Sequence, residues 1–166
     1  SVRAGWWYSA PLPGQQRVLA FHGLAEDVSA LYHNRDHFVA GAQASVLAGD
    51  GAEHLVPRGP LQSCDASARL SPQVAGKRWL AIGDAALSFA PLSSQGMHFA
   101  LYSAVKAADA LVASQPSLAE AYRAMETYCA QVSDVYKANQ RARHLFYTQE
   151  ERYRDAPFWR AQRASF

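Results

Sequence analysis

The chain has 166 residues, 49% of them hydrophobic and 18% charged, which is a globular composition and not a disordered one. Its formal net charge is +2, and basic and acidic residues are interleaved without the basic stripe that would indicate a nucleic-acid partner. Polar residues interrupt every apolar run well short of a membrane span. Two distant cysteines, Cys64 and Cys129, fit reduced thiols in a cytoplasmic protein better than a disulfide framework.

Aromatic and β-branched residues near the beginning of the chain predict a β-hairpin. They gather in residues 6–12 and 17–23. Between the two runs, Pro13 and Gly14 suit the central positions of a type II turn. The chain lacks an initiating Met and enters this strand-like stretch almost at once, so we expect it to be a piece of a longer protein.

Residues 27–47 are predicted to be helical, with Asp27 and Asn34 as candidate N-caps and Gly41 as a weak point. Five glycines and prolines in residues 49–60 then predict a loop. A short strand is expected near residues 61–66. The two histidines at positions 33 and 37 share a helical face, but without a metalloprotease pattern around them a metal site is not expected.

A compact apolar run predicts a buried strand over residues 79–82, ended by Gly83 and Asp84. After a loop that contains Pro91, residues 95–113 predict a helix. We expect it to pack through a stripe of mostly small residues. That stripe comprises Ala100, Ala104, Ala107, Ala108 and Leu111.

The longest helix is expected to begin after Ser117, because Glu120 three residues later completes a capping box. Apolar residues then recur at spacings of four and three and predict the buried face. They are Leu118, Tyr122, Met125, Cys129, Val132 and Tyr136. Beyond Thr148 the tail is charged and aromatic, and we expect Phe158 and Trp159 to pack onto the body.

The segment from Gly83 to Met97 combines a carboxylate at a strand end with a glycine at a helix start. The first turn of a helix presents unpaired N–H groups and a partial positive charge. Gly96 would let the backbone approach a flat ligand closely, and Asp84 could accept hydrogen bonds from hydroxyl groups. Taken alone, the Gly-Asp pair would more often be an ordinary strand end and turn.

The stretch Gly-Asp-Ala-Ala at 83–86, followed by Pro-Leu-Ser-Ser-Gln-Gly at 91–96, resembles the second FAD-binding motif of p-hydroxybenzoate hydroxylase-like flavoproteins, and most closely its tryptophan-halogenase-like branch. Two flanking stretches are similar to that branch as well. Gly-Trp-Trp-Tyr-Ser-Ala-Pro at 5–11 resembles a halogenase strand, and Asp-Ala-Pro-Phe-Trp at 155–159 resembles the segment that closes the helical C-terminal region. The resemblance therefore spans nearly the whole chain.

The resemblance implies that FAD is the cofactor and assigns the residues that contact it. These are Gly83, Asp84, Pro91, Ser94, Gly96 and Met97. Asp84 would bind the ribityl chain, Gly96 and Met97 would direct their N–H groups at flavin N1/O2, and Pro91 would lie between flavin and substrate. Tyr8 is a candidate for lining the substrate pocket. His98 is expected either to face the flavin or to lie on the helix surface or in the core.

Two departures from the family pattern bear on activity. Tyr8 and Ala10 replace a Trp and an Ile of the halogenase signature, which favours hydroxylation over halogenation. No Gly-x-Gly-x-x-Gly occurs in the 166 residues, so the unit that binds the ADP half of FAD is missing, and the chain alone should not retain FAD.

The resemblance implies an α+β fold, the C-terminal portion of a p-hydroxybenzoate hydroxylase-like FAD fold with a partial β-sheet and long C-terminal helices. Residues 1–70 would belong to the substrate-domain sheet, 71–114 to the second FAD-binding segment and 115–166 to the helical region. The expected activity is hydroxylation of an aromatic or peptide-borne substrate through a C4a-peroxyflavin, with a flavin reductase or NAD(P)H as electron source. The alternatives are a halogenase, a geranylgeranyl-reductase-type reductase and a non-catalytic flavin-fold escort module.

Overall fold

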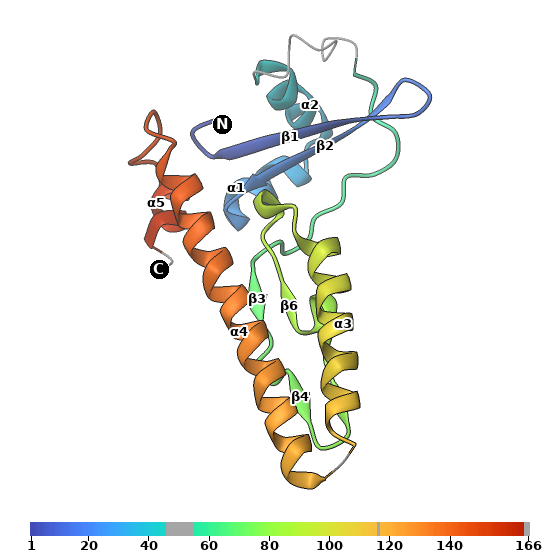
Figure 1. Ribbon diagram of the computed structural model, residues 1–166. Coiled ribbons are helices and arrows are strands. Elements are labelled where there is room, and N and C mark those ends of the chain that lie inside the picture. The colour runs from blue at the N-terminus through green and yellow to red at the C-terminus, as the bar shows by residue number, and fades with distance from the viewer. Residues whose placement is uncertain (46–54, 116, 165–166) are drawn as a thin grey trace. The chain divides into compact units, whose positions relative to one another are not determined.

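The computed structural model describes residues 1–45, 55–115 and 117–164. The chain divides into two compact units, one of residues 1–64 with 146–166 and the other of residues 65–145. Figure 1 shows the helices and strands, which together form a mixed α and β structure. Within the described residues, no helix is both long and apolar enough to cross a membrane.

The predicted hairpin is present in the first unit. Strand β1 (Gly5–Leu12) pairs antiparallel with β2 (Gln16–Gly23), and Leu12 lies opposite Gln16 at the turn. Gly14 has φ +72°, as the second central position of a type II turn requires. Gln15 is also left-handed, with φ +56°, so the connection has three residues rather than two.

The helical prediction for residues 27–47 is confirmed in its described part, where two helices form, α1 (Ala25–Tyr32) and α2 (Arg35–Ala44). Asn34 is extended between them, and its side chain accepts a 3.0 Å hydrogen bond from the His37 amide. The Asn34 cap was predicted correctly, and it is the reason that the helix breaks. Residues 46 and 47 lie outside the described residues.

Two further details of this helical region differ from expectation. Asp27 is not an N-cap but lies in the first turn of α1, which starts after Leu24. Gly41 is not a weak point: it is helical within α2, and a Cβ there would lie 2.9 Å from the ring of Trp7. Gly41 therefore lets the Trp7 indole pack directly against the helix backbone.

The strand expected near residues 61–66 is also wrong, because that segment is an irregular loop. The side chain of Asp65 instead accepts a 2.9 Å hydrogen bond from the Ser67 amide and pairs with Arg69. Such a local turn competes with strand pairing. Residues 55–60 form the expected loop, and residues 49–54 lie outside the described part.

The C-terminal tail packs as predicted through α5 (Pro157–Ala164). Phe158 and Trp159 are each only 3% exposed. Their rings meet that of Tyr147 edge-on, at centroid distances of 6.0 and 5.9 Å. The Trp6 indole N–H donates a 3.3 Å hydrogen bond to the Tyr147 hydroxyl, which ties the hairpin to this aromatic cluster.

The second unit places short strands between two helices (Figure 1). Strand β3 (Arg69–Leu70) pairs with β6 (Leu87–Ser88), β4 (Ala75–Gly76) pairs with β5 (Trp79–Leu80), and both pairs are antiparallel. The helices are α3 (Gly96–Ala113) and α4 (Leu118–Thr148). The buried core that joins these elements comprises Val74, Ala86, Leu87, Phe99, Ala107, Ala110, Tyr128 and Val132.

Helix α4 begins as predicted, because Ser117 accepts a 3.2 Å hydrogen bond from the Glu120 amide and donates one to the Glu120 carboxylate. Val132 of its predicted buried face is buried, and Cys129 and Tyr136 pack against the core. Leu118 and Tyr122, near the start of the helix, are exposed instead, and Tyr128, which was not predicted, is buried. The contact with the strand layer, rather than the count of apolar residues, decides which side faces inward.

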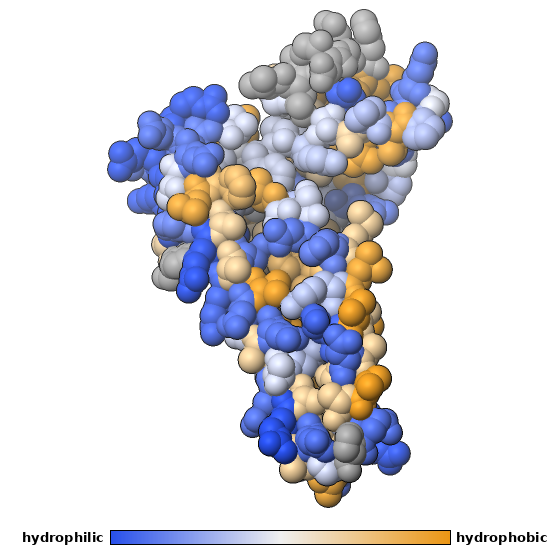
Figure 2. Space-filling view, viewed as in Figure 1, coloured by the Kyte–Doolittle hydropathy of each residue, from blue (hydrophilic) through white to orange (hydrophobic). Residues whose placement is uncertain are grey.

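Helix α3 has two apolar faces, and the described residues cover only one of them. The buried face is Phe99, Ser103, Ala107 and Ala110, whereas Ala108 and Leu111 of the predicted stripe are exposed. Figure 2 shows hydrophobic side chains gathered over the outer side of α3. This exposed face comprises Met97, Leu101, Val105 and Val112.

Candidate functional site

The segment that carries the sequence motif runs from β5 to the start of α3. Strand β5 ends at Leu80, two residues earlier than predicted, although the Ala81 amide still donates a 2.8 Å hydrogen bond to Val74. Ile82 is extended but 45% exposed, so the strand is not the fully buried one expected. A 3₁₀ turn, η3 (Gly83–Ala85), follows at once.

Gly83 is buried at the beginning of η3 and adopts a left-handed φ of +54°. A side chain there would be strained, and its Cβ would lie 3.4 Å from the Cβ of Ala100. The Gly83 amide donates a 2.9 Å hydrogen bond to the hydroxyl of Ser103, which is fully buried on α3. The turn therefore rests directly on one face of α3.

The carbonyl two residues before Gly83 is held by the other helix. The Tyr128 hydroxyl on α4 donates a 2.6 Å hydrogen bond to the backbone oxygen of Ala81. Tyr128 is 1% exposed, and burial raises the pKa of its hydroxyl, which keeps it protonated as a donor. Side chains from two helices thus form hydrogen bonds with the backbone groups of Ala81 and Gly83, just before Asp84.

Asp84 itself is exposed in the middle of η3 rather than at the last residue of a strand. Gly96 and Ala100 are four residues apart on α3 and so lie on the same face of the helix. Since Gly83 contacts Ala100, the Asp84 turn lies beside the first turns of α3.

Helix α3 begins where the motif predicts, with Gln95 at its N-cap and Gly96 as its first residue. Neither the Gly96 nor the Met97 amide has a hydrogen-bond partner within the described part of the chain. A Cβ on Gly96 would meet no atom within 4 Å, and Met97 is 86% exposed. The first turn of α3 therefore carries two unpaired donors at the positive end of the helix dipole.

The loop before α3 contains a hydrogen-bonded turn. Pro91 opens a second 3₁₀ turn, η4 (Pro91–Ser93), where its missing N–H costs nothing. Ser94 is left-handed, with φ +50°, and its amide donates a 3.2 Å hydrogen bond back to Pro91. Pro91 and Ser94 are both exposed, and Pro91 lies in the connection before α3, as predicted.

The remaining sequence candidates lie elsewhere. Tyr8 belongs to the first unit, on β1 opposite Ala20, and is 49% exposed. His98 is exposed in the first turn of α3, while His33 ends α1 and His37 lies in α2. Across the described residues, no group of three His, Cys, Asp or Glu side chains is placed to hold a metal ion.

Ser103 and Tyr128 were missed by the sequence interpretation. The signal for Ser103 was its position seven residues after Gly96, a polar residue on the otherwise small and apolar face of α3. Tyr128 gave a weaker signal, since it is next to Cys129, which had been assigned to the buried face. A tyrosine there buries its ring only if its hydroxyl finds a partner.

Comparison with known proteins places this geometry in a family. The model of the family described as "Tryptophan halogenase" matches residues 3–165. The protein named "Putative FAD-dependent oxidoreductase LodB" from Marinomonas mediterranea is 27% identical over 168 residues, covering 99% of this chain and 43% of its own length.

A solved structure agrees with that assignment at the level of the fold. The structure described as "Peptidyl tryptophan dihydroxylase QhpG essential for tryptophylquinone cofactor biogenesis" is 24% identical, with a TM-score of 0.75. The match covers 100% of this chain and 39% of that one, so the chain spans about two fifths of the length of these relatives. With the family match extending over nearly all of its residues, the chain belongs to the tryptophan halogenase family.

Proposed function

We propose that this chain supplies the ribityl- and pyrimidine-binding half of the FAD site in a flavin-dependent monooxygenase. The observation that carries the proposal is the start of α3 at Gly96, which leaves the Gly96 and Met97 amides unpaired beside the turn that presents Asp84. In fold terms, the chain would be the C-terminal portion of a p-hydroxybenzoate hydroxylase-like flavoprotein. Residues 71–114 would be its flavin-contacting segment, between a substrate-domain part (1–70) and a helical part (115–166).

The residues present fit such a cofactor. The open space at Gly96 admits a flat ring system, and the exposed Asp84 carboxylate can accept hydrogen bonds from ribityl hydroxyls. The Gly96 and Met97 N–H groups would stabilise negative charge at flavin N1/O2, and Gly83, Pro91 and Ser94 would shape the surrounding loop. Bound FAD supplies the reaction with oxygen, whereas the protein supplies orientation and electrostatics.

Hydroxylation of a peptide-borne aromatic side chain is the activity we favour. The name of QhpG describes a peptidyl tryptophan dihydroxylase, and LodB is named as an FAD-dependent oxidoreductase. Tyr8 and Ala10 depart from the halogenase signature in the direction of hydroxylation. A flavin reductase or NAD(P)H would provide electrons, and the two free cysteines suit a cytoplasmic location.

A halogenase is the second candidate, and the family membership is the observation that favours it. The experiment that separates the two uses the full-length protein with FAD, a flavin reductase, NADH and a tryptophan-containing peptide, with and without bromide. The proposal predicts a flavin absorption spectrum in the purified protein and a peptide that gains oxygen. A protein that binds no flavin at saturating FAD would contradict the site, and a brominated peptide would contradict the reaction.

A further inference from the structure

We infer that Tyr128 and Ser103 are positioning residues for Asp84, so that α4 of the helical C-terminal region takes part in flavin binding without touching the flavin. The inference rests on the proposed function and extends it to two residues outside the sequence motif. The two hydrogen bonds that carry it are Tyr128 Oη to Ala81 O, at 2.6 Å, and Gly83 N to Ser103 Oγ, at 2.9 Å.

These bonds fix the backbone where η3 begins. Ala81 and Gly83 flank Ile82 and directly precede Asp84, so their carbonyl and amide set the direction in which the turn leaves β5. Gly83 is left-handed, a conformation that glycine leaves easily because it has many alternatives. Without an external bond to its amide, the turn would sample several orientations, and the Asp84 carboxylate would move with it.

Both anchors are themselves rigid. Tyr128 and Ser103 are 1% and 0% exposed, and the Ser103 hydroxyl also donates a 3.1 Å hydrogen bond to the Ala100 carbonyl on its own helix. Ala100 is the residue against which Gly83 packs. The turn is therefore held by one bond from each helix and by a packing contact, whereas the side chain of Asp84 remains exposed.

The two hydrogen bonds are better explained by a need to hold Asp84 in position for a ligand than by a need to stabilise the core alone. An exposed carboxylate gains affinity for hydroxyl groups only when its position is set before the ligand arrives, since ordering it on binding costs affinity. A bond needed only to stabilise the core could link any two buried groups. Here both bonds converge on the three residues before Asp84.

The test uses the full-length protein with Tyr128→Phe and Ser103→Ala, each of which removes a hydroxyl and keeps the remaining shape. Tyr136→Phe is the matched control, because Tyr136 lies on the same helix and packs on the same core but receives its hydrogen bond from Gln140 of α4. Three quantities are measured: backbone hydrogen exchange of residues 81–86 in the apoprotein, FAD dissociation constants well below the melting temperature, and the spectrum of bound flavin.

We expect faster exchange of residues 81–86 and FAD binding weakened about three- to tenfold in both variants, with neither change in Tyr136→Phe. Unchanged exchange would show that the two bonds do not hold the turn. Faster exchange with wild-type FAD affinity and an unaltered flavin spectrum would show that the bonds are structural only. Either result overturns the inference but leaves the flavin site intact, whereas a wild-type protein that binds no FAD overturns the proposed function itself.

Discussion

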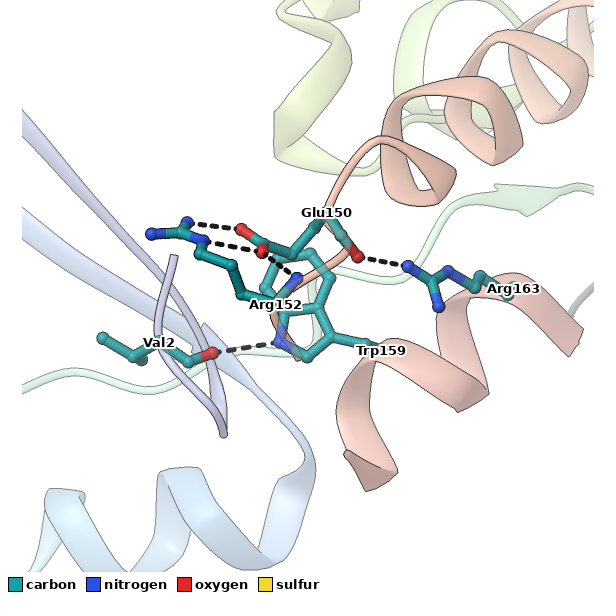
Figure 3. Close-up of polar contacts among 5 residues, drawn as sticks. All are labelled: Val2, Glu150, Arg152, Trp159 and Arg163. Carbon is teal, nitrogen blue, oxygen red and sulfur yellow. Dashed lines mark hydrogen bonds and ion pairs between the residues drawn. The ribbon is translucent and has the colours of Figure 1, made fainter. Parts of the chain in front are cut away.

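The indole N–H of Trp159 donates a 3.0 Å hydrogen bond to the backbone carbonyl of Val2, joining two residues that are 157 positions apart (Figure 3). Trp159 is 3% exposed, and its ring stands nearly perpendicular to that of Phe158. The Pro-Phe-Trp sequence therefore acts as an anchor for the N-terminal end of the chain in the first unit. The predicted packing of Phe158 and Trp159 is thus accompanied by a hydrogen bond to the N-terminal end of the chain.

The Trp159 anchor predicts a stability effect. We expect Trp159→Phe to lower the free energy of unfolding by about 1–3 kcal/mol, because it removes the bond to Val2 and leaves a smaller ring in a buried site. Trp79→Phe is the control, since Trp79 is 48% exposed and should lose much less. Chemical denaturation followed by circular dichroism measures both, and equal losses would contradict the anchor.

An ion pair in the same region predicts that the stability of the fold depends on pH. The backbone amide and guanidinium of Arg152 donate hydrogen bonds to the Glu150 carboxylate, at 3.0, 2.9 and 2.6 Å (Figure 3). They lower the pKa of Glu150 from its ordinary value of 4.5 to about 2. A lowered folded-state pKa contributes stability that is fully present above pH 4.5 and is lost as the pH falls towards 2.

We therefore expect the melting temperature to fall between about pH 5 and pH 2, and to fall less steeply in Glu150→Gln. Glu151→Gln removes the neighbouring exposed charge and serves as the control. The Glu150 backbone carbonyl accepts from Arg163, and this bond remains in both variants. An identical pH profile for wild type and Glu150→Gln would contradict the assignment.

The two glycines of the motif predict opposite effects on stability. Gly83→Ala should destabilise the fold by about 1–2 kcal/mol, since Gly83 is left-handed and its Cβ would meet Ala100. Gly96→Ala should leave stability unchanged or slightly raised, because alanine favours a helix and the space there is open.

We expect Gly96→Ala nevertheless to weaken FAD binding, because its methyl group would occupy the surface offered to the flavin. Thermal unfolding and FAD titration of the full-length variants separate the two effects. If Gly96→Ala bound FAD as wild type does, the first turn of α3 would not be the contact surface.

Substitutions in the halogenase-like strand predict the choice of reaction. Restoring the halogenase residues with Tyr8→Trp and Ala10→Ile should not improve hydroxylation of a tryptophan-containing peptide and should, if anything, reduce it. Tyr8 is half-exposed on β1, and Ala10 lies in the same strand, so neither change should disturb the hairpin. Mass spectrometry of the peptide, with bromide present, measures how much hydroxylated and brominated product forms. A brominated product from the unmodified protein would favour halogenation over hydroxylation.

Sequence patterns predicted the hairpin, the start of α3 and the capping box of α4, because each depends on residues close in the chain. Asn34 shows the limit of such reasoning: its capping potential was visible, but the same residue could have remained inside one longer helix. The burial of Tyr128 on α4 could not be predicted either. Tyr128 faces inward because its hydroxyl reaches the Ala81 carbonyl, 47 residues away in sequence.

The local geometry of the proposed flavin site was predictable in part for the same reason. Gly96 and Met97 begin a helix because a left-handed Ser94 and a 3₁₀ turn precede them, which is local geometry. The position of Asp84 is not local, since it depends on the contacts of Gly83 with Ala100 and Ser103 on α3. The sequence motif identifies the residues that we propose to contact flavin, whereas contacts with α3 and α4 determine where these residues lie.

The central claim is that Asp84 holds FAD, and the most direct measurement is the FAD dissociation constant of Asp84→Ala in the full-length protein. Losing a charged acceptor of hydroxyl hydrogen bonds should weaken binding about tenfold to a hundredfold while the melting temperature stays near wild type. Asp134→Ala removes the same charge from an exposed site on α4, where Asp134 pairs only loosely with Lys137 at 3.6 Å, and should bind FAD normally. Wild-type FAD affinity in a folded Asp84→Ala protein would contradict the account.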